Sequence, residues 1–137
     1  MIDDVGFVIA PLNSLDYFVD KWVYILSTMR EDLKMSGSNV LVLHYMDVNH
    51  KGAYSFTESH AENIISFIND YRGSIETIVC ACDSGISRSS GICIALMEEF
   101  GQDPECIWND NYYRPNIHVY KTMKKVLEQK KVKLWRG

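Results

Sequence analysis

Residues 75–100 read IETIVCACDSGISRSSGICIALMEEF, and they indicate how the whole chain is organised. Their first seven residues form an apolar run of the length expected for a buried strand. Residues 90–100 predict a largely buried helix, and Gly101 ends it. Between the strand and the helix lies a short polar segment that contains Cys82, Gly85 and Arg88. In α/β domains such strand–loop–helix junctions are where ligands bind.

Strands and helices alternate on both sides of this segment. Short apolar runs predict further strands over residues 5–10, 22–26 and 40–46. Helices are predicted for five segments: 15–21, 58–71, 90–100, 104–110 and 117–129. We therefore predict a single α/β domain, residues 1–137, with a central, mainly parallel sheet flanked by helices on both faces.

Composition and charge exclude several classes of protein. The chain has 137 residues, of which 47% are hydrophobic, and a formal net charge of −4. A protein that grips many nucleic-acid phosphates would carry the opposite sign. No apolar run reaches the ~20 residues of a membrane span, and Asp3 and Asp4 stand where a signal peptide would be basic. We expect a cytoplasmic monomer that binds neither nucleic acid nor membrane.

The junction itself has the residues needed to bind and attack a phosphate group. A tight loop before a helix N-terminus aims N–H groups at one point and makes an anion site. Gly85 permits the turn, and Arg88 supplies a planar fork for two phosphate oxygens. The same field lowers the pKa of Cys82, which favours a thiolate nucleophile beneath the bound anion. Ser89 can hydrogen-bond the sulfur and help it leave in a second step.

Residues 82–89, CDSGISRS, resemble the signature loop of the cysteine-dependent protein tyrosine phosphatases, Cys-x5-Arg-Ser/Thr. They are most similar to the compact dual-specificity branch, including its small bacterial and phage members. Residues 43–49 (LHYMDVN), 56–68 (FTESHAENIISFI) and 112–123 (YYRPNIHVYKTM) resemble that branch as well. The resemblance implies its fold and hydrolysis of phosphate monoesters through a phosphocysteine, with no metal or cofactor. It also implies a phosphorylated protein or peptide as the partner.

The resemblance assigns roles to individual residues. Cys82 is the nucleophile, Ser89 assists it, and Asp47, which lies 35 residues earlier, is the general acid. Relatives often carry an acid two residues later, where this chain has Asn49, and His50 is a substitute proton donor. The implied phosphate-binding loop consists of Asp83, Ser84, Gly85, Ile86, Ser87 and Arg88.

Two features of the loop refine this hypothesis. The family often has His before the cysteine, whereas this chain has Ala81, which removes one support for a low thiolate pKa. The variable positions Asp83, Ser84, Ile86 and Ser87 include no base, although phosphatases of inositol lipids tend to have Lys there. Because Asp83 would meet a polyanion at the entrance, the loop favours phosphotyrosine in proteins, with phosphoserine or phosphothreonine also possible, over an inositol lipid or an RNA 5′ end.

Alternatives remain open at this point. The chain is also compatible with a phosphate-binding module that has lost turnover, or with a sulfurtransferase or arsenate reductase that uses a similar cysteine loop. Cys80 is either a core residue or a resolving thiol for oxidised Cys82, and Cys93 and Cys106 are predicted to be core. The four histidines have no metal spacing, and His60 is interpreted as structural. The last open question is whether Arg114 and Asn116 steady the loop or only start a helix.

Overall fold

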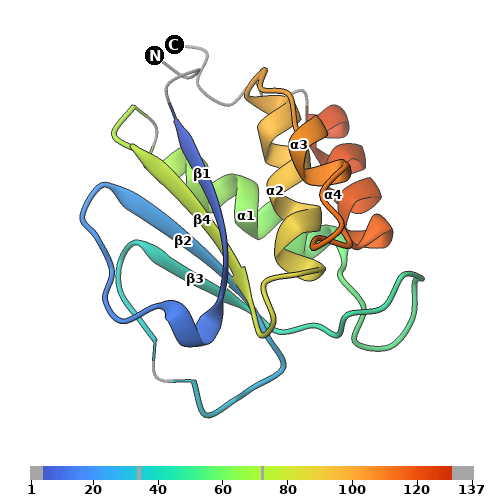
Figure 1. Ribbon diagram of the computed structural model, residues 1–137, viewed down its shortest axis with the longest axis horizontal. Helices are drawn as coiled ribbons and strands as arrows, with labels where there is room; N and C mark the ends of the chain where they lie inside the picture. The colour runs from blue at the N-terminus through green and yellow to red at the C-terminus, as the bar shows by residue number, and fades with distance from the viewer. Residues whose placement is uncertain (1–4, 34, 72, 131–137) are drawn as a thin grey trace.

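The computed structural model describes residues 5–33, 35–71 and 73–130, so Asp3 and Asp4 lie outside the described residues. The protein is an α/β structure built on a four-stranded, all-parallel sheet with the order β1-β4-β2-β3 (Figure 1). The strands are β1 (Gly6–Pro11), β2 (Trp22–Ser27), β3 (Val40–Leu43) and β4 (Thr77–Cys82). The predicted α/β class and parallel sheet are confirmed.

Four α-helices follow the pattern expected from the sequence. They are α1 (Glu58–Asp70), α2 (Arg88–Glu99), α3 (Glu105–Trp108) and α4 (Ile117–Lys130). Thr57 caps α1, because its hydroxyl accepts the His60 N–H while the His60 ring accepts the Thr57 N–H. This capping box gives His60 the structural role that was predicted for it.

The helices cover one face of the sheet, and the expectation of helices on both faces is wrong. Residues of all four α-helices belong to one core cluster with the sheet side chains that face them (Figure 1). The opposite face carries the short 3-10 helix η2 (Leu12–Ser14) and loop residues of the segments that join β1 to β2 and β2 to β3. Among the described residues no α-helix packs there, and apolar side chains of the two connections, such as Leu12, Leu15 and Phe18, cover that face instead.

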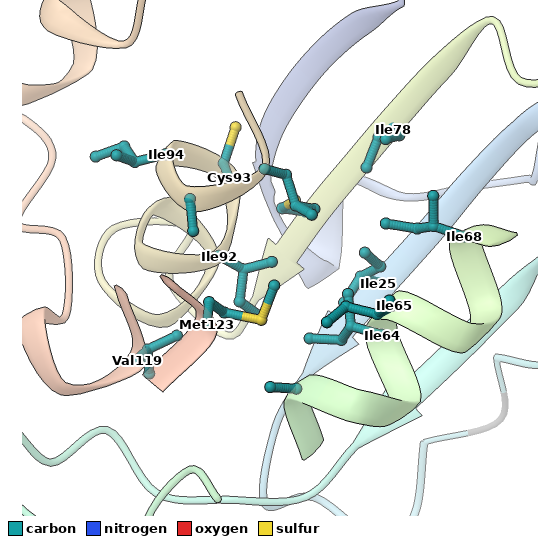
Figure 2. Packing of buried hydrophobic residues seen from close by; sticks show 14 of the residues in the cluster. Ile25, Ile64, Ile65, Ile68, Ile78, Ile92, Cys93, Ile94, Val119 and Met123 are labelled. Atoms are coloured by element: carbon teal, nitrogen blue, oxygen red, sulfur yellow. The ribbon is translucent and has the colours of Figure 1, made fainter. Parts of the chain in front are cut away.

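The helical face forms the main core. In Figure 2, Ile64, Ile65 and Ile68 of α1 face Ile25 of β2, and Met123 of α4 lies beside Ile92 of α2. All of these side chains are buried. Ten of the twelve residues of α2 are buried, which matches the apolar run that predicted it. The core therefore holds α2 firmly against β4, together with the loop that connects the two elements.

Two predicted elements differ from the structure. No helix forms over residues 15–21. Leu15 and Phe18 pack on the second sheet face instead, and the Val19 N–H is satisfied by the Tyr24 hydroxyl at 2.9 Å. The strand predicted to reach residue 46 ends at Leu43, after which the Tyr45 carbonyl turns toward Arg88.

The register of the sheet brings three strand ends together. Cys82, the last residue of the central strand β4, lies opposite Pro11 of β1 and Ser27 of β2. The loop after Cys82 therefore emerges between the ends of two neighbouring strands, as expected for the binding edge of a parallel sheet. In the part of the chain that the structure describes, no helix has the length and apolar character required to cross a bilayer.

Candidate active site

The loop after β4 depends on glycine at one position. Gly85 has φ +72°, a conformation that side chains oppose. An added Cβ would lie 2.6 Å from the Pro11 nitrogen and 2.8 Å from the Ala10 carbonyl carbon. The loop therefore folds tightly over the end of β1, which only glycine permits.

Cys82 lies at the base of this loop. It is 1% exposed, and its Sγ lies 3.1 Å from Ser89 Oγ. Burial raises the pKa of the Cys82 thiol, but the Ser89 hydroxyl, the backbone amides of Ser89 and Gly85, and the Arg88 charge together outweigh burial. The net effect is that the pKa of Cys82 falls below its usual value, so the thiolate is favoured even without a preceding histidine.

Arg88 begins α2, near enough to Cys82 for its charge to act on the thiol, and is 9% exposed. Its Nη1 donates to the Tyr45 carbonyl at 3.0 Å, and its Nη2 donates to Asp83 Oδ2 at 3.1 Å. Asp83 also accepts a hydrogen bond at Oδ1 from the Thr28 hydroxyl, at 2.8 Å. Asp83 therefore makes supporting hydrogen bonds, and its carboxylate is paired with Arg88 while its side chain stays 42% exposed.

Asp47 lies on the rim of the loop, on the exposed segment after β3. Its Oδ1 accepts hydrogen bonds from Ser87 Oγ at 2.8 Å and from Asn116 Nδ2 at 2.7 Å. Within the described ranges, Oδ2 has no protein hydrogen-bond partner. One oxygen of Asp47 is thus tied to the loop after β4, and the other is left free of protein partners among the described residues.

Asn116 links three parts of the structure: the loop after β4, the segment after β3 that contains Asp47, and α4. Its side chain donates to Asp47 and to the Val48 carbonyl, and its Oδ1 accepts the Val119 N–H in the first turn of α4. Its backbone N–H donates to the Ser87 carbonyl, and that of Arg114 donates to the Ile86 carbonyl. This segment therefore contacts the loop as well as starting α4, so the interpretation that it only starts a helix is wrong.

An open groove of about 850 Å³ runs along the rim. Asp47, Ser84, Ile86 and Ser87 line one part of it, while Cys82 lies beneath the loop and outside the groove lining. The rest of its lining is Asn49 and, from residues 108–117, Trp108, Asn111, Tyr112, Arg114, Pro115 and Ile117. The groove therefore has an aromatic and aliphatic surface next to the loop.

Other candidate residues lie away from this centre. His50 is exposed and does not line the groove. The Cys80 thiol forms a hydrogen bond with Cys93 of α2, and this contact and burial raise the pKa of Cys80, which disfavours a role as a resolving thiolate. Cys93 is buried as predicted, but Cys106 is exposed, so the prediction that it belongs to the core is wrong. In the described residues, no three His, Cys, Asp or Glu side chains gather as metal ligands.

Sequence reasoning missed Thr28 and Tyr45, the two residues outside the loop that help hold Arg88 and Asp83. Both lie just after strands that end at the same sheet edge as β4. The sequence predicted a strand over residues 22–26, which places Thr28 close to a strand end. The contact of Thr28 with Asp83 could not be predicted, because it depends on the order of the strands in the sheet.

Comparison of the chain with protein families, with curated proteins and with solved structures yields no match. What the protein does is therefore inferred from the geometry of the site itself.

Proposed function

We propose that this protein is a phosphatase of phosphotyrosine in proteins or peptides, similar to the compact dual-specificity branch. The observation that carries the proposal is the Cys82 sulfur beneath a tight loop, with a lowered pKa and with Arg88 beside it. A thiolate, backbone amides and a guanidinium that converge in this way suit attack on a phosphate monoester.

In the first step the Cys82 thiolate attacks phosphorus, the S–P bond forms and the bond to the leaving oxygen breaks. Loop amides and the unused N–H groups of Arg88 bind the equatorial oxygens, on which charge develops. Asp47 gives its proton to the leaving alkoxide or phenoxide. Because Oδ1 of Asp47 already accepts two hydrogen bonds, the transferred proton belongs on Oδ2.

In the second step water attacks the phosphocysteine and loses a proton to Asp47. The S–P bond breaks, inorganic phosphate leaves, and the thiolate and the protonated Asp47 are restored. The Ser89 hydroxyl, 3.1 Å from the sulfur, stabilises the departing thiolate. The sum of both steps is hydrolysis of the ester by one water, and the scheme requires no metal or cofactor.

The groove supports a polypeptide substrate. Trp108, Tyr112 and Ile117, three large exposed hydrophobic residues, line it next to the loop. A surface of this kind suits residues that flank a phosphotyrosine better than the headgroup of an inositol lipid. All four cysteines are free thiols, and as part of the proposal we assign the enzyme to the reducing cytoplasm.

Hydrolysis of p-nitrophenyl phosphate in EDTA tests the proposal. We expect turnover by the wild type and none by Cys82→Ser, because a hydroxyl in that position is a far weaker nucleophile. Cys106→Ser, the same change at an exposed cysteine of α3, is the control and should retain full activity. Tungstate binding without turnover would identify a phosphate-binding module, and turnover of thiosulfate or arsenate instead would overturn the assignment.

A further inference from the structure

Asp83, the residue directly after the nucleophile, joins Arg88 to the sheet. Its Oδ2 accepts from Arg88 Nη2 at 3.1 Å and its Oδ1 accepts from the Thr28 hydroxyl at 2.8 Å. We propose that Thr28 and Asp83 are a pair of positioning residues that orient the Arg88 guanidinium before phosphate binds. This inference rests on the phosphatase function proposed above.

Thr28 is well suited to anchor the pair. It is fully buried and follows β2 directly, and the pairing of Ser27 with Cys82 brings Thr28 beside Asp83. Its N–H donates to the Leu43 carbonyl at 3.0 Å, and its Oγ accepts the Arg30 N–H at 3.0 Å. The hydroxyl therefore has a fixed direction, and Asp83 takes its orientation from it.

The contacts on Arg88 leave donors for a substrate. A guanidinium has five N–H groups. Tyr45 and Asp83 take one each, on Nη1 and Nη2, and no other protein partner of this side chain occurs among the described residues. The remaining three can bind phosphate oxygens. Without Asp83 only the Tyr45 carbonyl would hold the Arg88 guanidinium. The orientation of the guanidinium would then have to be set during each turnover.

Charge and orientation lead to opposite expectations for this pair. The Asp83 carboxylate cancels part of the Arg88 charge, so if charge alone mattered, its removal would strengthen anion binding and speed turnover. If Asp83 instead orients the guanidinium, its removal destabilises the transition state more than the bound substrate, because the transition-state oxygens need both donors in place. The two views therefore differ in the sign of the change in kcat.

Asp83→Asn separates these views, since the amide oxygen still accepts from Thr28 but an N–H₂ group then faces the Arg88 Nη2. We expect kcat for p-nitrophenyl phosphate to fall about tenfold or more, with KM changed less than about threefold. Asp32→Asn, the same change at the exposed ion pair with Arg30, is the matched control and should leave kcat within about twofold. Unchanged or faster turnover by Asp83→Asn overturns the inference.

Thr28→Val and Thr28→Ser provide a second test that leaves every charge in place. We expect Thr28→Val to lower kcat several-fold with little change in KM, and Thr28→Ser, which keeps the hydroxyl, to restore it. Equal kcat for the valine variant and the wild type refutes the role of Thr28. If the wild type does not hydrolyse the substrate, the proposed function fails, and calorimetry with vanadate, which mimics the five-coordinate transition state, then tests positioning alone. Weaker vanadate binding by Thr28→Val supports positioning, and equal binding contradicts it.

Discussion

The Ser89 hydroxyl lies 3.1 Å from the sulfur of Cys82, the proposed nucleophile, and the effect of this contact can be measured as a function of pH. The thiolate exists above the pKa of Cys82, so a lowered pKa extends its alkylation by iodoacetate to lower pH. Ser89→Ala removes a hydrogen bond that lowers this pKa, and we therefore expect the alkylation profile of Cys82 to move to higher pH.

Mass spectrometry of the labelled peptide distinguishes Cys82 from the exposed Cys106, whose profile should be the same in both proteins. A Cys82 profile that stays in place or moves to lower pH in Ser89→Ala would show that the hydroxyl does not stabilise the thiolate.

A second prediction about a single residue concerns Asp47 and depends on how strongly the leaving group needs a proton. Asp47→Asn cannot supply a proton, so we expect kcat for an alkyl phosphate to fall by about 10²–10⁴. With p-nitrophenyl phosphate, whose leaving group is stable as an anion, the first step should lose much less. Rates for a series of aryl and alkyl phosphates would test this, and a loss equal for all leaving groups would mean that Asp47 is not the proton donor.

The loop is the element on which the site depends, and Gly85 and Gly101 form a natural comparison. Both have positive φ, +72° and +79°, but an added Cβ at Gly101 meets nothing within 4 Å. Alanine at either position adopts an unfavourable backbone conformation, at about 1–2 kcal/mol. Gly85→Ala also forces a methyl group against the end of β1, so we expect it to lower the free energy of unfolding by about 1–3 kcal/mol more.

Urea unfolding of the two variants measures this difference, and phosphatase activity should be lost only in Gly85→Ala. Equal stability of the two variants would mean that the loop can move away from β1 without cost, contrary to the close packing described above.

At the scale of the whole molecule, local patterns predicted most elements and the core of the site. The apolar runs located all four strands, and the spacing of Cys82, Gly85 and Arg88 located the loop. Helices on both faces could not be excluded, because local periodicity does not say which face a connection crosses. Thr28 and Tyr45 escaped notice for a related reason: their importance comes from strand order, and Thr28 contacts Asp83 across 55 positions of sequence.

The contacts of Asn116 make the position of Asp47 depend on a distant part of the chain. Its amide joins Asp47 to the first turn of α4, across 69 positions of sequence. Under the proposed mechanism, the proton donor is therefore held by a residue that follows the nucleophile in the chain. A change that disturbs the start of α4 would displace the acid while leaving Cys82 and Arg88 in their own element contacts.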